Sequence, residues 1–239
     1  MKKYVFITGA PGSAWGRIEA QIRKSTDVID STNFQPYLQD NINNSTNHIH
    51  KFYGPYQQHG ERFDVMHLMG PDAVMEEIDK SFDPSDIRPI RFVRSHWFAY
   101  QLDWIKEHLP QVDIISVFRE SQMSYDWWHQ SGGWGITYPN YKWYATSENM
   151  MRQIKIENDC ILKFMFENKL KMTDNTWDLD KWFQNQWPEL ESYVKPNMDW
   201  PSIKNPAQDY TVWPVRYEGK ESPTTVSYTH LRAHETSLH

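Results

Sequence analysis

Residues 4–17 read Tyr4-Val5-Phe6-Ile7-Thr8-Gly9-Ala10-Pro11-Gly12-Ser13-Ala14-Trp15-Gly16-Arg17, and this stretch decides the fold. Its first five residues are apolar, aromatic or β-branched, which predicts a buried strand, and Ile18 and Ile22 follow at helical spacing. Glycines in the turn between them let the backbone approach a phosphate, and the N–H groups of the helix start point at it. The order strand, glycine-rich turn, helix predicts an anion cradle, with a plain strand-to-helix turn as the alternative.

The turn lacks the Gly-Lys-Ser or Gly-Lys-Thr ending of the ATPase phosphate loop. This argues against an ordinary ATPase and leaves other phosphate ligands open. The same absence, together with the lack of a clear magnesium carboxylate, disfavours a kinase of small metabolites.

Composition excludes several classes of protein. A length of 239 residues suits one α/β domain, and 39% hydrophobic residues are enough for a core. The net charge of -6 disfavours a nucleic-acid partner bound through a basic surface. The single cysteine, Cys160, rules out an internal disulfide and a cysteine-based zinc cluster. His48 and His50 have no third ligand nearby, so a solvated loop is favoured over a metal site.

Neither a membrane span nor a signal peptide is indicated, so we expect a soluble, cytoplasmic protein. The end of the chain stands apart. Residues 226–236 read VSYTHLRAHET and resemble one reading frame of a sequencing-library adaptor. We therefore expect a metagenomic sequence with a single domain over residues 1–225, whose natural C-terminus can be missing. Residues 226–239 are expected to be an artefactual tail.

Predicted strands and helices alternate along the chain. The strands expected after residue 8 are 64–69, 90–93 and 113–118; the helices expected after residue 22 are 71–80, 98–108, 121–130, 146–170 and 175–186. Residues 25–62 are expected to form an irregular insertion, and residues 188–225 to be weakly structured. This alternation predicts a three-layer α/β sandwich around a central parallel sheet with crossover helices.

Polar residues follow three of the predicted strands, at the edge where such sheets bind ligands. The first strand leads into the glycine-rich turn, the strand 90–93 into Arg94-Ser95-His96, and the strand 113–118 into Arg119 with Ser121 and Ser124. The cradle and the two arginines suit a ligand with two phosphate groups, and the histidine suits the role of a general base.

In these three segments the chain resembles the sulfotransferases that use 3′-phosphoadenylyl sulfate (PAPS), especially small forms from marine cyanophages. Residues 9–15 resemble the family's 5′-phosphosulfate loop, and residues 94–96 resemble the strand end that carries its catalytic base. Arg119 with Ser121 or Ser124 resembles its 3′-phosphate motif. Residues 122–129 and the later Gly132-Gly133 and Tyr138-Pro139-Asn140-Tyr141 are similar to the phage-type proteins, so the likeness spans residues 3–145.

The resemblance implies a P-loop-like, sulfotransferase-type fold and transfer of a sulfuryl group from PAPS to a hydroxyl or amine, leaving adenosine 3′,5′-bisphosphate. The acceptor would be a small molecule or a glycan, and a phage-encoded enzyme would work in the host cytoplasm. His96 and Arg94 would be catalytic. The residues that would bind PAPS are Pro11, Gly12, Ser13, Ala14, Trp15, Gly16, Arg17, Arg119, Ser121 and Ser124.

The chain also departs from the family's pattern. Gly12 stands where the family has its loop lysine, for which Arg17 or Arg94 are the candidate substitutes. The spacing from Arg119 to Ser124 is five rather than eight, and the C-terminal Arg-Lys-Gly motif is absent. The alternative function is therefore a catalytically weak or inactive P-loop-like protein that binds a nucleotide or glycan.

The individual site residues have structural alternatives. His96 could bond to the backbone, and Arg94 and Arg119 could form ion pairs with Asp113 or Glu120. Ser13 could cap a helix, while Trp15 could stack on adenine or pack in the core. Four tryptophans are expected mainly in the core, and the alternative is that they line a groove for the acceptor. They are Trp127, Trp128, Trp134 and Trp143.

Overall fold

The computed structural model describes residues 3–30, 66–79, 82–130, 146–172, 182, 185–188 and 212–219. Its elements in chain order are β1 (Lys3–Gly9), α1 (Trp15–Ser25), β2 (Ile29–Asp30), α2 (Met66–Met69), α3 (Pro71–Asp79), β3 (Ile90–Arg94), α4 (Phe98–His108), β4 (Val112–Arg119), α5 (Ser121–Gln130), α6 (Ser147–Glu167) and β5 (Val212–Tyr217). The strands form one sheet in the order β2-β3-β1-β4-β5, parallel except for β5. The fold is therefore mixed α/β with an open, mostly parallel sheet.

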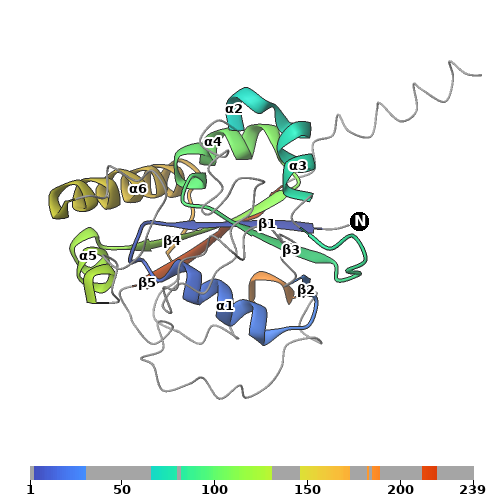
Figure 1. Cartoon of the computed structure of the whole chain (residues 1–239), viewed down its shortest axis with the longest axis horizontal. Coiled ribbons are helices and arrows are strands. Elements are labelled where there is room, and N and C mark those ends of the chain that lie inside the picture. Colours follow the sequence, from blue (N-terminus) through green and yellow to red (C-terminus); the bar gives the residue numbers. More distant parts are fainter. Residues whose placement is uncertain are drawn as a thin grey trace, which may run out of the picture.

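Alternating side chains of β1 enter two separate cores, because successive residues of a strand point to opposite faces. Val5 and Ile7 pack with Ile18 and Ile22 of α1. Phe6 faces the other way, and its ring stacks on Phe98 of α4 with ring centroids 4.6 Å apart. Figure 1 shows α1 on one side of the sheet and α4 and α6 on the other. Helices thus cover both faces, as in an α/β sandwich.

The central strand lies at a switch in the chain's path. β1 is flanked by β3 and β4, and the helix that follows β1 lies on the opposite face from the helix that follows β3. In open parallel sheets, ligands bind outside the carboxyl ends of the strands at such a switch point. This topology places the residues after β1 and β3 at the expected binding edge.

Most predicted elements are confirmed, but the predicted strand at 64–69 is wrong at its described residues. Met66–Met69 forms the short helix α2, and Met66 is fully buried. Gly70, with φ of 82°, joins α2 to α3, and its N–H donates to the carbonyl oxygen of Met66 at 3.3 Å. A short apolar run is compatible with a strand or with a helix, and here the hydrogen bond from Gly70 to Met66 has the helical spacing of four residues.

The strands β2 and β5 occur where irregular chain was expected, and β5 makes the sheet mostly rather than entirely parallel. β5 pairs antiparallel with β4, with Pro214 opposite Val117. Proline disrupts a central strand but is tolerated at a sheet edge, where its missing N–H is not needed, and β5 stands last in the sheet order. At the other end, the two-residue strand β2 pairs with β3.

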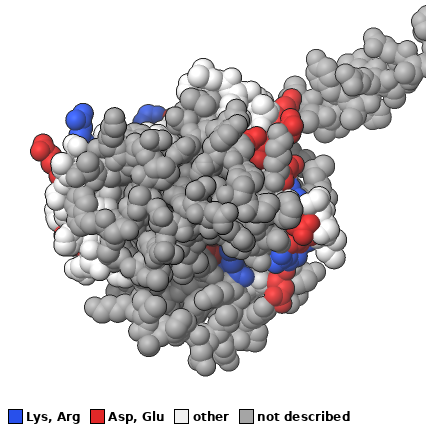
Figure 2. Space-filling view, viewed as in Figure 1, with Lys and Arg blue, Asp and Glu red and all other residues white. Residues whose placement is uncertain are grey.

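Several predictions fall outside the described residues: those on His48 and His50, on Trp134 and Trp143, and on the tail at 226–239. The predicted helix at 175–186 is described only at positions 182, 185 and 186. Within the described part, no helix is long and apolar enough to cross a membrane. Figure 2 shows acidic and basic side chains lying next to one another along the described margin of one face.

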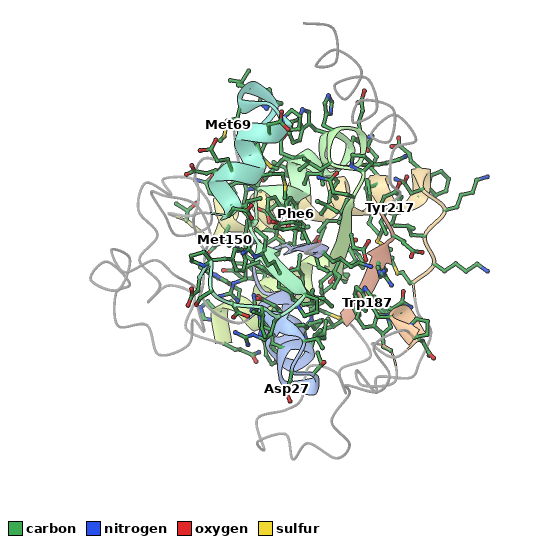
Figure 3. The ribbon with its side chains drawn as sticks, turned by 90° about the vertical axis from the view of Figure 1, so that its right-hand side faces the viewer. Phe6, Asp27, Met69, Met150, Trp187 and Tyr217 are labelled. Carbon is green, nitrogen blue, oxygen red and sulfur yellow. The ribbon has the colours of Figure 1, made fainter. Side chains whose placement is uncertain are left out.

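A buried carboxylate ties the C-terminal segments to the sheet. Asp113 of β4, only 2% exposed, accepts hydrogen bonds from Arg216 Nε at 3.0 Å and Trp187 Nε1 at 3.3 Å. Lys3 Nζ lies 3.0 Å away, and the N–H of Gly219 donates at 3.1 Å. Figure 3 shows Trp187 beside β5, where the Arg216 guanidinium lies 3.9 Å from the centre of its ring. Four residues from three segments of the chain thus meet at one buried carboxylate.

Replacing that carboxylate should unfold the protein more easily. In Asp113→Ala the buried Arg216 loses its buried counter-charge and keeps only the exposed Glu218 at 3.8 Å, so we expect the free energy of unfolding in urea to fall by about 3–5 kcal/mol. The control is Asp103→Ala, which removes an exposed partner of Lys163 and should have little effect. Similar losses in both variants would contradict the importance of this cluster.

Candidate functional site

The loop after β1 contains a tight turn that is encoded by Pro11 and Gly12. The N–H of Ser13 donates to the carbonyl oxygen of Ala10 at 3.0 Å, and Gly12 has φ of 77°. Proline followed by a glycine with positive φ is the pattern of a type II turn. Ala14, at the N-cap of α1, is also left-handed with φ of 65°. Such loops make concave surfaces whose N–H groups bind anions.

Gly12 lies directly against α5. A Cβ atom at this position would stand 1.8 Å from the carbonyl oxygen of Ser124 and 2.9 Å from Cβ of Trp128. No side chain fits there without moving the loop or the helix. The family lysine therefore has no room at position 12 in this arrangement, which gives a physical reason for the departure seen in the sequence.

The hydroxyl of Ser13 is buried, and the described part of the chain offers it no hydrogen-bond partner. Its side chain is 0% exposed, and Oγ has no hydrogen-bond partner among the residues that the structure describes. It lies over the backbone of Gly9, where a Cβ atom would approach Oγ to 2.5 Å. The N-cap Ala14 supplies no side-chain hydrogen bond to α1. An unsatisfied buried hydroxyl lowers the stability of the folded protein by about 1–3 kcal/mol. A polar ligand group that bonds to Ser13 would remove this penalty.

Arg119 connects the end of β4 to this loop. Its Nη1 donates to the carbonyl oxygen of Gly12 at 3.3 Å, and its guanidinium lies 5.0 Å from the ring centre of Trp127. The side chain is largely buried. Trp127 thus packs against a site arginine, whereas Trp128 is buried in a small cluster with Met150 and Ile154.

The two candidate serines after β4 have structural partners. Ser124 is fully buried, and its hydroxyl donates to the carbonyl oxygen of Arg119 at 3.1 Å. Nδ2 of Asn158 donates to that same oxygen at 2.8 Å and to Oγ of Ser121 at 3.1 Å. Both hydroxyls therefore help to fix α5 and α6 to the end of β4.

The N-terminus of α5 already holds a negative charge. Oε2 of Glu120 accepts from the N–H of Met123 at 3.0 Å. The backbone N–H groups of Gln122 and Met123 lower the pKa of the Glu120 carboxyl below its ordinary value. A phosphate at this helix start would have to displace the carboxylate, which leaves Arg119 as the cation for a phosphate near β4.

Arg94 is paired with a buried acid from α1. Its Nη1 lies 2.9 Å from Oε2 of Glu19, and both side chains are buried. Oε1 of the same carboxylate lies 2.6 Å from Nε of Arg23. The sequence suggested Asp113 or Glu120 as partners, but Asp113 pairs with Lys3 and Arg216. Glu19 thus offsets only part of the positive charge at this point, since Arg94 and Arg23 share its single carboxylate.

Trp15 packs between the two candidate catalytic residues. The Arg94 guanidinium lies 5.8 Å from its ring centre, and the His96 ring meets it edge-on with centroids 4.9 Å apart. Trp15 is buried and belongs to the core on the α1 side. Gly16 lies beside Arg94, and Arg17 belongs to the same helix, but its side chain lies outside the described part.

His96 is buried and faces a carboxylate that the sequence analysis missed. Nδ1 lies 3.3 Å from Oε2 of Glu157 on α6, and the His96 carbonyl oxygen accepts from Oγ1 of Thr8 at 3.5 Å. The sequence does contain a pattern that points to Glu157, because this acid interrupts the apolar helix face formed by Ile154 and Ile161. An acid on a core-facing position needs a buried partner.

The structure therefore brings the three predicted segments to one edge. Arg119 contacts the loop at Gly12, and His96 contacts the loop's helix at Trp15. Among the described residues, no group of three or more metal-binding side chains occurs. No family model matches the sequence, and no curated protein matches it either. The site's chemistry must therefore be argued from its own geometry.

The tight contact at Gly12 can be tested against a glycine of similar backbone conformation. Gly12→Ala and Gly70→Ala both force alanine into a left-handed conformation, but nothing lies within 4 Å of a Cβ atom at Gly70. We expect Gly70→Ala to cost about 1 kcal/mol from conformation alone, and Gly12→Ala to cost about 1–3 kcal/mol more from overpacking. The measurement is urea unfolding; equal costs would contradict the close packing on Ser124.

The Glu120 cap should give a pH-dependent stability. Its pKa is lower in the folded state, so its contribution is present above the unfolded pKa of about 4.3 and is lost as the pH falls through the folded pKa. Glu120→Ala should cost about 0.5–2 kcal/mol at pH 7. The difference from the unsubstituted protein should shrink below pH 4.3. Unfolding curves at pH 7 and pH 3, with exposed Glu107→Ala as control, check this; a constant difference would exclude the cap.

Proposed function

We propose that the protein is a PAPS-dependent sulfotransferase that transfers a sulfuryl group to a hydroxyl or amine of a small molecule or glycan. One observation carries the proposal: the segments that resemble the family's loop, base and 3′-phosphate motif meet at one sheet edge, through the contacts Arg119–Gly12 and His96–Trp15. The mostly parallel α/β sheet is compatible with the P-loop-like fold that this function implies.

The loop's own groups fit the 5′-phosphosulfate of the donor. The backbone from Gly12 to Gly16 would supply N–H groups, the dipole of α1 favours an anion there, and the buried Ser13 hydroxyl would gain a partner. Arg119 would face the 3′-phosphate. Ser121 and Ser124 would act indirectly, by holding the strand end from which Arg119 projects.

His96 would serve as the general base. It takes the proton of the acceptor hydroxyl as the acceptor oxygen bonds to sulfur and the bond between sulfur and the bridging phosphate oxygen breaks. The electron pair of the broken bond stays on that phosphate oxygen of adenosine 3′,5′-bisphosphate. The N–H groups of the loop would stabilise the charge that develops there.

The second candidate is a protein that binds the nucleotide without efficient transfer. Two observations favour it: Gly12 has no room for a lysine, and Glu19 offsets the charge of Arg94. In this case the anion cradle and Arg119 keep their binding roles, while turnover is slow or absent.

Ligand-induced stabilisation tests the assignment. Adenosine 3′,5′-bisphosphate should raise the melting temperature more than ATP, since a ligand at 100 times its Kd stabilises by about 2.7 kcal/mol. Arg119→Ala should lose most of the preference for the bisphosphate over adenosine 5′-monophosphate, a ratio measured within one variant and thus insensitive to its stability. An equal response to bisphosphate and ATP would refute both candidates. Bisphosphate binding without sulfuryl transfer to a panel of sugars, phenols and amines would select the second.

A further inference from the structure

Glu157 is a buried carboxylate whose described partners come from three elements. It is 1% exposed. Its Oε1 accepts from Nε2 of Gln153 at 2.9 Å and from the hydroxyl of Tyr100 at 3.4 Å, and its Oε2 faces Nδ1 of His96 at 3.3 Å. An ionised carboxylate can only accept hydrogen bonds, and burial without donors is costly. The position facing His96 therefore calls for a donor.

We propose that Glu157 is a positioning residue that holds His96 with its proton on Nδ1. A neutral imidazole carries one proton, so a proton on Nδ1 leaves Nε2 with the lone pair. Nε2 is then the atom that acts on a substrate. The base role of His96 rests on the proposed function, whereas the tautomer rests only on the contacts of Glu157.

The pair also gives the proton a defined place. When Nε2 takes a proton from an acceptor hydroxyl, His96 becomes an imidazolium that still donates from Nδ1 to Glu157. The carboxylate stabilises this cation and does not itself take the proton. The buried pair passes from one net negative charge to neutrality as the proton arrives, which favours proton transfer in a site of low dielectric constant.

Replacing Glu157 by glutamine should reverse the tautomer. Tyr100 and Gln153 both donate to Oε1, so the amide oxygen of the new side chain takes that place. Its NH₂ group then faces Nδ1 of His96, which must accept. The proton moves to Nε2, and the base loses its lone pair at the substrate side. Asp159→Asn is the matched control, because it removes one negative charge from an exposed position of the same helix.

The experiment is long-range ¹H–¹⁵N NMR of the full chain without ligand, over a pH series that reaches the neutral ring. The His96 signals are assigned by their loss in His96→Ala. We expect the Nδ1–H tautomer in the unsubstituted protein and in Asp159→Asn, and the Nε2–H tautomer in Glu157→Gln. An Nε2–H tautomer in the unsubstituted protein overturns the proposal, and so does a folded Glu157→Gln that keeps the proton on Nδ1. If Glu157→Gln does not fold, the tautomer of the unsubstituted protein decides alone.

The result is separable from the test of the proposed function. The expected tautomers without any stabilisation by adenosine 3′,5′-bisphosphate would leave the Glu157–His96 pair intact and remove the sulfotransferase assignment. Binding of the bisphosphate together with the opposite tautomer would remove only the positioning role. Glu157→Gln should itself bind the bisphosphate as the unsubstituted protein does, since none of the described partners of Glu157, which are His96, Tyr100 and Gln153, belongs to the anion loop.

Discussion

The contact between the backbones of Gly12 and Ser124 is the constraint on which the site depends. It seats the loop after β1 on the start of α5, with less space between them than a single Cβ atom needs. In this arrangement Arg119 donates to the carbonyl oxygen of Gly12. The helix α1 begins three residues after Gly12 with Trp15, whose ring meets His96. A longer residue at position 12 would separate the anion loop from the end of β4.

The charges at the site edge are partly balanced by buried acids. Arg94 and Arg23 share the carboxylate of Glu19, and Glu157 faces His96. Burying such groups is affordable only with partners at hydrogen-bond distance, so these acids stabilise the fold and weaken the local positive field together. Under the proposed function, the N–H groups of the loop and the arginines at this edge would attract the anion without the lysine of the family that the chain resembles.

Local patterns predicted the elements well, because hydrophobic period and capping act over a few residues. Thr146 caps α6 as its sequence indicates, accepting from the N–H of Asn149 at 3.1 Å. Partners distant in the chain could not be predicted this way. Asp113 and Glu120 were suggested as partners for Arg94, yet it pairs with Glu19, 75 positions away. Even so, both missed acids had a signal, since Glu19 and Glu157 each occupy the apolar face of a helix. The edge strand β5 was missed because Pro214 breaks the pattern of a strand.

Those two acids come from opposite layers of the molecule. α1 and α6 lie on different faces of the sheet, yet Glu19 and Glu157 meet residues only two positions apart at the end of β3 (Figure 1). Arg94 pairs with Glu19 of the α1 layer, while Nδ1 of His96 faces Glu157 of α6 and its ring meets Trp15 of α1. A topological switch point divides the two layers in this way, because successive crossovers leave the sheet in opposite directions. Both layers therefore contribute to the surroundings of His96, and the loop after β1 also packs against α6, because Ala10 shares a buried cluster with Met150 and Ile154.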